Sequence, residues 1–409
     1  MTDRGEVMTS PALDRLRASI SSDIELERHL AAIEDVEDFA VAAARCADEA
    51  GLALTPDEIR AALKPDPLGL DRFDDRPPRA SSRPAGHWLP GAVVSSGGAL
   101  AVDWVHFGGR PLTEPFFEDS LRRARQRPIN MLLRHRTALA DLVSNGADRP
   151  DVAPDGFIFH MSRCGSTLVA QMLAADERHL VLSEAPPLDT VVQLAHGRRD
   201  ASMDERVALL KAMVGALGQG PDARRRRYFV KLDSWHTLAL PLFRRAFPDT
   251  PWLFLYRDPV EVLVSHMRMR GFQTVPGAMG DLYGIAGGER MAAETYVAHV
   301  LARICEAALT HRPLGRGLFV NYRELPRAVE TRILPHFGIA PDDGMLRAMA
   351  MAAQRNAKMP RTAFERDETS KQAEAGPALR SAAEAVLGDV HRHLEAVSGA
   401  AITKEFASA

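Results

Sequence analysis

The sequence is poor in cysteine and has no long apolar run. Its 409 residues include three widely spaced cysteines, Cys46, Cys164 and Cys305. An odd, scattered set of this kind predicts neither a disulfide framework nor a zinc cluster, and it is typical of the reducing cytoplasm. The sequence also lacks the apolar stretch of a secretory signal and any run of about 18 apolar residues. We therefore expect a soluble cytoplasmic protein with no membrane partner.

An excess of one charge is also missing. Lysine and arginine number 51, and aspartate and glutamate 54, for a formal net charge of −3. Because proteins that bind nucleic acid usually carry a strongly basic surface, we expect no nucleic-acid partner. A hydrophobic content of 46% and a charged content of 26% are those of an ordinary globular protein. The length indicates one large domain and an accessory piece.

The accessory piece is predicted to be a small all-helical module at residues 1–64. The segments 22–25 and 55–58 each place a hydroxyl residue three positions before a glutamate, which predicts two capping boxes. Asp35 is expected to cap a further helix. The apolar face of that helix, at helical spacing, includes Phe39, Ala42, Ala43 and Cys46. We therefore expect Cys46 to be buried rather than reactive.

The segment VEDFAVAAARCADEAGLALTPDEIRAAL, residues 36–63, resembles the Nif-type leader-peptide family. The resemblance implies a module that contacts a protein or peptide partner. A double glycine often ends such leaders, and Gly97 and Gly98 follow downstream. Because they lie between the strand-like runs VVSS and ALAVDW, a hairpin turn is the favoured interpretation.

Residues 65–90 are predicted to be a linker, since they hold many prolines among charged and small residues. Residues 91–150 follow as a mixed extension, with two or three strands and a basic helix around residues 120–142. The remainder, residues 151–400, is predicted to be one large domain.

Short apolar runs alternate with helical segments through that domain. The runs occupy residues 157–161, 179–184, 227–233, 252–257 and 318–322. Helices are expected at 237–247 and 260–268, among others. Repeated strand–helix units predict an α/β fold in which a parallel sheet is sandwiched between helices. Ligands of such sheets bind at the carboxyl ends of the strands.

A loop of small residues follows the first of these runs. It reads Ser162, Arg163, Cys164, Gly165, Ser166 and Thr167 and leads into a helix. Free backbone N–H groups and the helix dipole at such a turn favour a phosphate. Gly165 allows close backbone approach, and the hydroxyls of Ser166 and Thr167 add donors. The charge-assisted hydrogen bonds of Arg163 are expected to be the strongest single contribution.

Other phosphate loops fit this segment poorly. A Walker A loop requires Gly-Lys before the hydroxyl residue, whereas Ser166 occupies the place of that lysine. A tyrosine-phosphatase loop requires an arginine six residues after Cys164, where Ala170 stands. A P-loop kinase or hydrolase stays open as an alternative, with Asp233 after an apolar strand in place of the Walker B aspartate.

A second segment, WLFLYRDPVEVLVSHMR at residues 252–268, carries Arg257 at a strand end and Ser265 two helical turns later. Together with the loop at 162–167, it resembles the sulfotransferase family over about residues 155–340. The resemblance implies 3′-phosphoadenylyl sulfate as the sulfuryl donor, with no metal. It also implies that Arg257 and Ser265 bind the 3′-phosphate, that Arg163 contacts the transferred group, and that Lys358 closes over the nucleotide.

The expected reaction is in-line transfer of a sulfuryl group to a hydroxyl or amine, for which a base must accept a proton. Glu184 is the favoured base. It ends a strand expected beside that of the phosphate loop, at the position of the glutamate base of tyrosylprotein-type sulfotransferases. His236 is the rival, although other members carry a histidine where this chain has Asp233. Lys231 is expected to touch the sulfuryl group. The acceptor, a small molecule or peptide, stays open, and so does a catalytically inactive binding protein.

Overall fold

The computed structural model describes most of the chain. The described residues are 10–63, 84, 87–109, 111–144, 152–197, 201–220, 227–358, 362 and 367–407. Most of the predicted linker at 65–90 lies outside them. The chain divides into two compact units, one of which comprises Met1–Pro111, Glu118–Val152 and Gly215–Ala223. The other comprises Leu112–Phe117, Ala153–Val214 and Arg224–Ala409. No described helix has the length and apolar character of a membrane span.

The first unit begins with four helices, α1 (Pro11–Ser22), α2 (Ile24–Ala31), α3 (Val36–Glu49) and α4 (Pro56–Ala62). The predicted capping box at Thr55 is confirmed, since Thr55 and Glu58 exchange side-chain and backbone hydrogen bonds. The capping box predicted at Ser22 is wrong. Asp23 caps α2 instead, because Ser22 is still the last residue of α1, whereas Asp23 has the extended backbone of a cap, with φ −117° and ψ 104°.

Helix α3 is capped by Asp35, as predicted. Its inward face is displaced from the predicted one. The buried residues of α3 are Phe39, Ala40, Ala43, Ala44 and Ala47. Ala47 takes the inward position in the last turn, so Cys46 is only half-buried and the prediction of its burial is wrong.

A three-stranded antiparallel sheet follows, in the order β1 (Trp88–Ser96), β2 (Ala99–His106) and β3 (Arg136–Ala138). Gly97 and Gly98 have φ of 57° and 79°, so the predicted hairpin turn is confirmed. The single basic helix predicted around 120–142 is wrong. Pro128 separates α5 (Phe117–Arg125) from α6 (Pro128–Leu133), and β3 and α7 (Leu139–Ser144) follow.

Buried hydrogen bonds connect the helices and the strands of this unit. Trp88, the first residue of β1, donates from Nε1 to Oε1 of Glu27 on α2 at 2.9 Å. Arg127, just before α6, donates to the carbonyl of Ala31 at 2.5 Å and to Oε1 of Glu34 at 2.6 Å. Trp88 lies within residues 65–90, which were predicted to be a linker, so that prediction is wrong at its end, where β1 begins.

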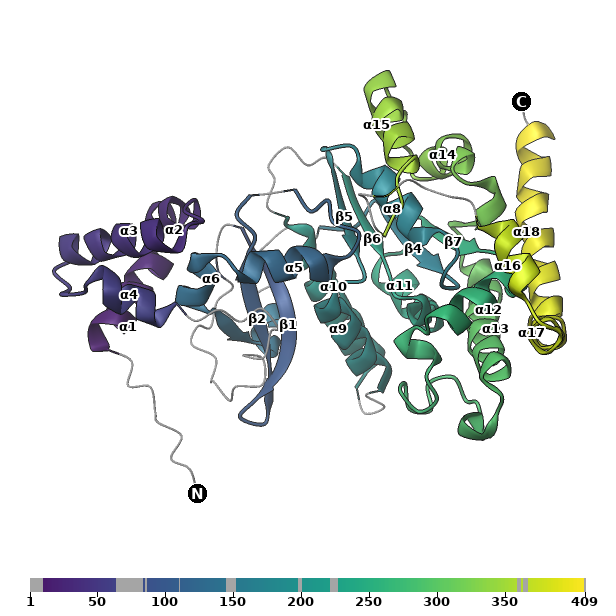
Figure 1. The fold of residues 1–409 in the computed structure, drawn as a ribbon, viewed down its shortest axis with the longest axis horizontal. Helices are drawn as coiled ribbons and strands as arrows, with labels where there is room; N and C mark the ends of the chain where they lie inside the picture. Colours follow the sequence, from purple (N-terminus) through teal and green to yellow (C-terminus); the bar gives the residue numbers. More distant parts are fainter. Residues whose placement is uncertain are drawn as a thin grey trace. The chain divides into compact units, whose positions relative to one another are not determined.

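The second unit is built on a five-stranded parallel sheet, which confirms the predicted α/β fold (Figure 1). Its strands are β4 (Gly156–His160), β5 (His179–Ser183), β6 (Arg227–Lys231), β7 (Trp252–Tyr256) and β8 (Gly317–Asn321). They correspond to the five predicted apolar runs, and their order in the sheet is β5-β6-β4-β7-β8. Nearly all strand residues are buried, as expected for a sheet covered on both faces.

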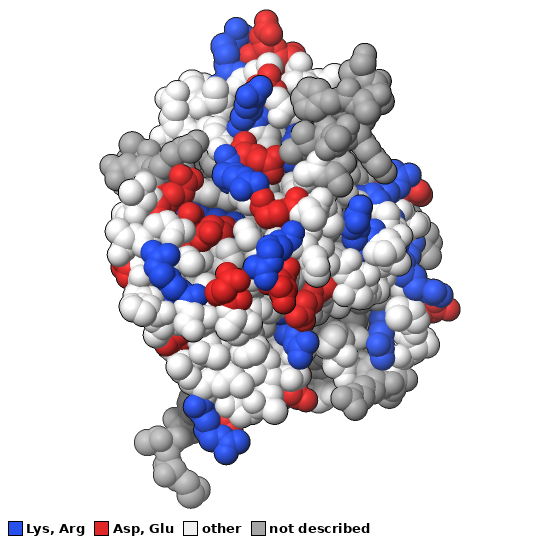
Figure 2. All heavy atoms as spheres, turned by 90° about the vertical axis from the view of Figure 1, so that its right-hand side faces the viewer, with Lys and Arg blue, Asp and Glu red and all other residues white. Residues whose placement is uncertain are grey.

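Helices flank this sheet (Figure 1). They are α8 (Ser166–Ala174), α9 (Pro186–Gly197), α10 (Met203–Gly218), α11 (Leu240–Ala246), α12 (Pro259–Arg268), α13 (Ala293–His311), α14 (Leu334–His336), α15 (Asp343–Ala353), α16 (Glu368–Glu374), α17 (Pro377–Ala382) and α18 (Gly388–Ala407). The helix predicted at 237–247 starts instead as a 3₁₀ helix, Ser234–Ala239, that leads into α11. One face of the molecule carries basic and acidic side chains side by side (Figure 2).

Candidate active site

A cavity of about 500 Å³ lies at the carboxyl ends of the strands of the second unit. Every strand of the sheet contributes a lining residue at or just beyond its carboxyl end. These residues are His160 of β4, Glu184 after β5, Asp233 after β6, Arg257 after β7 and Tyr322 after β8. Ligands of parallel sheets bind at this edge. The structure thus gathers at one place residues that lie more than 160 positions apart in the chain.

Most of the predicted site residues line this cavity. They are Ser162, Arg163, Cys164, Gly165, Ser166, Thr167, Glu184, Arg257, Ser265 and Lys358. Lys231 and His236 are buried, with 1% of each side chain exposed, and they do not line it.

The loop after β4 has a backbone that L-residues seldom adopt. Ser162 and Arg163 have φ of 87° and 51°, and such conformations cost about 1–3 kcal/mol each unless the surroundings hold them. His160 supplies part of that hold. Its Nδ1 accepts from the backbone N–H of Ser162 at 3.1 Å, while its Nε2 donates to the carbonyl of Leu232 at 2.9 Å. Burial lowers the pKa of His160, which favours this neutral form.

Gly165, the residue before α8, is required for two reasons. Its φ is 87°, and a Cβ added to it would lie 2.7 Å from the ring of Tyr322 and 2.9 Å from the side chain of Leu325. The backbone therefore passes closer to Tyr322 than any other residue type allows. Ser166 and Thr167, both buried, then open α8 with their backbone N–H groups at the cavity.

The thiol of Cys164 is buried within the loop. Its side chain is fully buried, and its Sγ donates to the carbonyl of Leu255 at 3.2 Å. Burial raises the pKa of Cys164 to about 11. A protonated, buried sulfur is a poor nucleophile, so the arrangement does not support tyrosine-phosphatase chemistry.

Positive charge is concentrated around the loop. Arg163 donates to the carbonyl of Met269 at 2.9 Å and extends along the cavity wall. Partial desolvation of the ammonium group, and then the charges of Arg163 and Lys231, lower the pKa of Lys358 to about 8. The cations of Arg163, Lys231 and Lys358 thus share this region, and the carboxylates of Glu184 and Asp233 lie near it. Such an excess of positive charge suits an anionic ligand.

Glu184 is held by an ion pair. Lys231 donates from Nζ to its Oε1, and Nε2 of His160 lies 3.6 Å from the same oxygen. Burial opposes ionisation of Glu184, but Lys231 and His160 outweigh it and lower the pKa of the carboxyl well below its usual range. The predicted adjacency of its strand to β4 is wrong, since β6 lies between β5 and β4. Lys231, on β6, spans that gap.

A second group of charges surrounds Arg257. Its Nε donates to Glu261 and its Nη2 to Asp367, both at 2.6 Å. Its guanidinium group lies over the ring of Tyr322, with Cζ 3.9 Å from the centroid. Lys371 forms an ion pair with the other oxygen of Asp367 at 2.6 Å.

Ser265 lines the same cavity as Arg257, as the two-turn spacing predicts. Its hydroxyl donates to the carbonyl of Glu261 at 2.8 Å, so it must rotate away from that carbonyl to donate to a phosphate. Asp367 and Lys371 are absent from the set predicted from sequence. Nothing in their spacing links them to Arg257, because α16 reaches α12 only through the tertiary fold.

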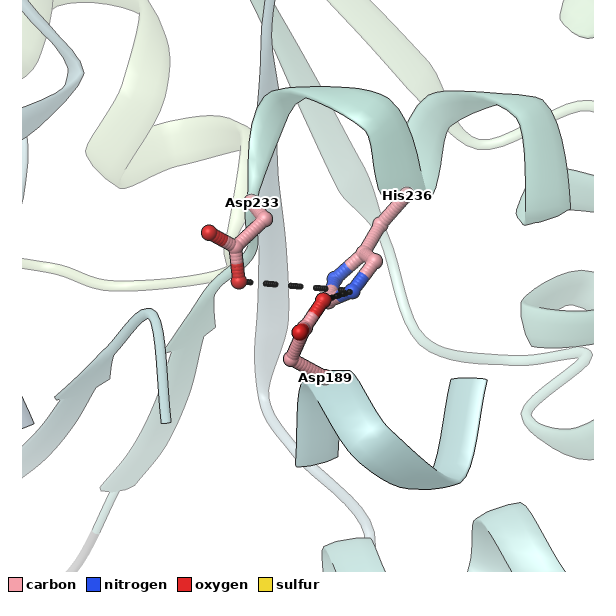
Figure 3. A group of neighbouring side chains, drawn as sticks. All are labelled: Asp189, Asp233 and His236. Carbon is pink, nitrogen blue, oxygen red and sulfur yellow. Dashed lines mark hydrogen bonds and ion pairs between the residues drawn. The ribbon is translucent and has the colours of Figure 1, made fainter. Parts of the chain in front are cut away.

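His236, which does not line the cavity, forms a polar cluster with Asp189 and Asp233 (Figure 3). Its Nε2 donates to Oδ1 of Asp189 at 3.0 Å and lies 4.0 Å from Oδ2 of Asp233. Trp235 donates to the same Asp189 oxygen at 2.8 Å. The three possible ligand atoms lie within 4.8 Å of one another. Since hydrogen bonds already join two of them, we interpret the group as a polar cluster and not as a metal site.

Comparison with known proteins identifies residues 154–343 with the family model described as the sulfotransferase family. Among solved structures, sulfotransferase STF9 from Mycobacterium avium is 13% identical, covers 61% of this chain and 80% of its own, and has a TM-score of 0.41. Sulfotransferase STF1 from Mycobacterium tuberculosis H37Rv is 16% identical, with 55% and 77% coverage and a TM-score of 0.36. The sulfotransferase domain of the Synechococcus PCC 7002 olefin synthase is 19% identical, with 61% and 96% coverage and a TM-score of 0.35. No curated protein sequence matches the chain significantly.

Proposed function

Residues 154–343 form a sulfotransferase family domain, and we propose that this transferase moves a sulfuryl group from 3′-phosphoadenylyl sulfate to a hydroxyl or amine. The observation that carries the proposal is the cavity itself. It joins the loop 162–167 to the pair Arg257 and Ser265, so that two anion-binding groups face one space. Its volume of about 500 Å³ lies within the usual range of roughly 300–1,000 Å³ for small-ligand sites.

The 5′-phosphosulfate is assigned to the loop. The backbone N–H groups at the start of α8, the hydroxyls of Ser166 and Thr167, and the side chain of Arg163 supply donors there. Lys358 lines the same cavity, and an anion between it and Arg163 offsets the desolvation and the repulsion that lower its pKa. The 3′-phosphate is assigned to Arg257 and Ser265, where it competes with Asp367 for the guanidinium group.

Transfer then proceeds in line. An acceptor oxygen or nitrogen forms a bond to sulfur while the bond from sulfur to the phosphate oxygen breaks. The leaving phosphate gains negative charge. Arg163 and Lys358, which line the cavity, stabilise that charge directly, and Lys231, which does not line it, stabilises it at longer range. The ion pair with Lys231 makes Glu184 a weak proton acceptor, so we assign it the role of holding that lysine. His236 does not line the cavity, and we give it no direct contact with the acceptor.

Binding of adenosine 3′,5′-bisphosphate, measured by calorimetry in the presence of a chelator, tests the donor site. We expect binding without Mg²⁺, whereas a P-loop kinase or hydrolase would bind ATP with Mg²⁺. Absence of binding at hundred-micromolar ligand would contradict the assignment. Release of labelled sulfate from 3′-phosphoadenylyl sulfate separates an active transferase from an inactive binding protein. Arg163→Ala should lower that release on the order of 10²-fold, and Arg163→Lys should restore part of it.

A further inference from the structure

Asp233 lies beside the phosphate loop without being part of it. It follows β6 by two residues, and β6 pairs directly with β4, with Ile158 opposite Lys231. The backbone N–H of Leu232 donates to the carbonyl of Ile158 at 3.0 Å. The carboxyl end of β6 is therefore fixed against the strand that leads into the loop.

One side chain joins the two segments across the cavity. Nε2 of Gln273 lies 3.3 Å from Oγ of Ser162, the first residue of the loop, and 3.3 Å from Oγ of Ser234, the neighbour of Asp233. All four residues line the cavity. Gln273 thus connects the loop to Ser234, the residue that follows Asp233 in the chain.

The carboxylate of Asp233 is available for chemistry. It precedes the 3₁₀ helix Ser234–Ala239 but accepts no hydrogen bond from the described backbone of that helix. One of its oxygens faces His236, and the other points away from it (Figure 3). The side chain of Asp233 is 30% exposed, and the residue lines the cavity. Glu184, by contrast, is held by Lys231.

Titratable groups on several elements face Asp233 and shift its pKa. His236 faces it from the 3₁₀ helix, Asp189 from α9, and Glu184 and Lys231 from the ends of β5 and β6. Burial, and then the charges of Glu184 and Asp189, raise the pKa of Asp233 to about 7, although His236 and Lys231 oppose the shift. Tyr283 also faces this cluster, and its buried hydroxyl has no hydrogen-bond partner among the described residues.

We propose that Asp233 is the base that accepts the proton of the sulfuryl acceptor. The assignment rests on the proposed function. In the step, the acceptor O–H or N–H bond breaks and its proton passes to the carboxylate as the bond to sulfur forms. The electron pair of the broken sulfur–oxygen bond stays on the leaving phosphate. Asp233 returns the proton to solvent, so that donor and acceptor yield the sulfated product, the bisphosphate and one proton.

Asp233→Asn tests the assignment, with labelled 3′-phosphoadenylyl sulfate as donor and water as the acceptor that is always present. The carboxamide is close in size to the carboxylate but accepts no proton. We expect kcat for sulfate release to fall on the order of 10²–10³-fold, while calorimetric binding of adenosine 3′,5′-bisphosphate changes less than about threefold. The rise of kcat/KM through about pH 7 in the wild type should disappear in the variant. Asp233→Glu should recover part of the activity.

Each outcome decides a separate question. If the wild-type protein neither binds the bisphosphate nor releases sulfate, the proposed function is wrong. Wild-type protein that does both, beside an Asp233→Asn variant with the same turnover and pH limb, overturns this inference alone. An infrared difference spectrum between wild type and Asp233→Asn measures the protonation of the Asp233 carboxyl without turnover. If that carboxyl does not titrate between pH 5 and pH 9, the inference is also overturned. Asp204→Asn, a change at an exposed aspartate outside the cavity, is the matched control.

Discussion

Lys231 donates a hydrogen bond from Nζ to Oε1 of Glu184, and this contact joins the carboxyl end of β6 to that of β5. The lysine side chain is 1% exposed and the glutamate side chain 27%. A buried ammonium group is tolerated only with a partner of opposite charge, since its desolvation is otherwise uncompensated. The pair is therefore a structural requirement of the cavity wall as well as part of its electrostatics.

Glu184→Gln should destabilise the protein because it leaves the ammonium group of Lys231 buried without a counter-charge. Breaking a buried ion pair costs about 3–5 kcal/mol, and partial exposure of Glu184 places the expected loss at about 2–3 kcal/mol. The free energy of unfolding in urea measures it. The double variant Glu184→Gln with Lys231→Met should be more stable than the single one, because no charge is then left unpaired. A single variant within about 0.5 kcal/mol of the wild type would contradict the role of the pair.

The same pair predicts how stability depends on pH. The pKa of Glu184 is lower in the folded protein than in the unfolded chain, where it is about 4.3. Its contribution is therefore fully present above that value and is lost as pH falls toward the folded pKa. We expect the stability difference between wild type and Glu184→Gln to be fully present near pH 5, below the range in which Asp233 titrates. It should shrink below about pH 4. A difference that grows toward acid pH would contradict this sign.

The parts of the fold that depend on local signals were predictable. Thr55 with Glu58, and Gly97 with Gly98, act through hydrogen bonds and backbone angles within four residues, so their pattern predicts the structure directly. The five strands of the large sheet follow from apolar runs in the same way. Pro128 is a local signal of the same kind, and the prediction of a single helix around 120–142 overlooked it, since a helix ends before this proline and another begins at it.

The parts that depend on the order of strands were not predictable. Runs of apolar residues do not reveal the order of the strands in the sheet. Strand β6 lies between β5 and β4, so the strand that ends at Glu184 is not the predicted neighbour of β4. The pairing of Arg257 with Asp367 spans 110 residues and has no counterpart in local sequence. The resemblance of residues 36–63 to leader peptides stays a prediction, as does a peptide partner for them. Most of the predicted site residues are brought together at the cavity, with Lys231 and His236 outside its lining.

Gly165→Ala should disable the phosphate loop. The left-handed backbone costs alanine about 1–2 kcal/mol, and the contact with Tyr322 adds about 1–3 kcal/mol of overpacking. Because the guanidinium group of Arg257 lies over the ring of Tyr322, a shift of that ring should weaken anion binding both at the loop and at Arg257. Calorimetry should show loss of adenosine 3′,5′-bisphosphate binding. Gly215→Ala is the control, since no atom lies within 4 Å of its added Cβ and helix α10 should gain about 0.5–1 kcal/mol. Equal nucleotide affinity in wild type and Gly165→Ala would contradict the assignment of the loop.

The affinity for adenosine 3′,5′-bisphosphate should fall at alkaline pH through Lys358. Its pKa of about 8 means that the charge is present below pH 8 and is lost above it. The bound anion favours the charged form, so binding takes up a proton near pH 8. We expect the Kd to be steady below about pH 7 and to rise on the order of tenfold by about pH 9.5. Lys358→Arg keeps its charge through this range and should flatten the profile. A wild-type profile as flat as that of the arginine variant would exclude Lys358 from the site.

Asp367→Asn should strengthen nucleotide binding. The carboxylate of Asp367 accepts from Arg257 and pairs with Lys371, so it occupies the cations to which the 3′-phosphate is assigned. At 39% exposure the competing ion pair is worth only about 1 kcal/mol, which predicts an affinity gain of roughly three- to tenfold. The gain should be confined to adenosine 3′,5′-bisphosphate, because adenosine 5′-monophosphate carries no phosphate to place there. Asp389→Asn, at an exposed aspartate of α18, should change neither affinity. If Asp367→Asn weakened both nucleotides equally, the carboxylate would be ordering the cavity wall, and the 3′-phosphate would have to bind elsewhere.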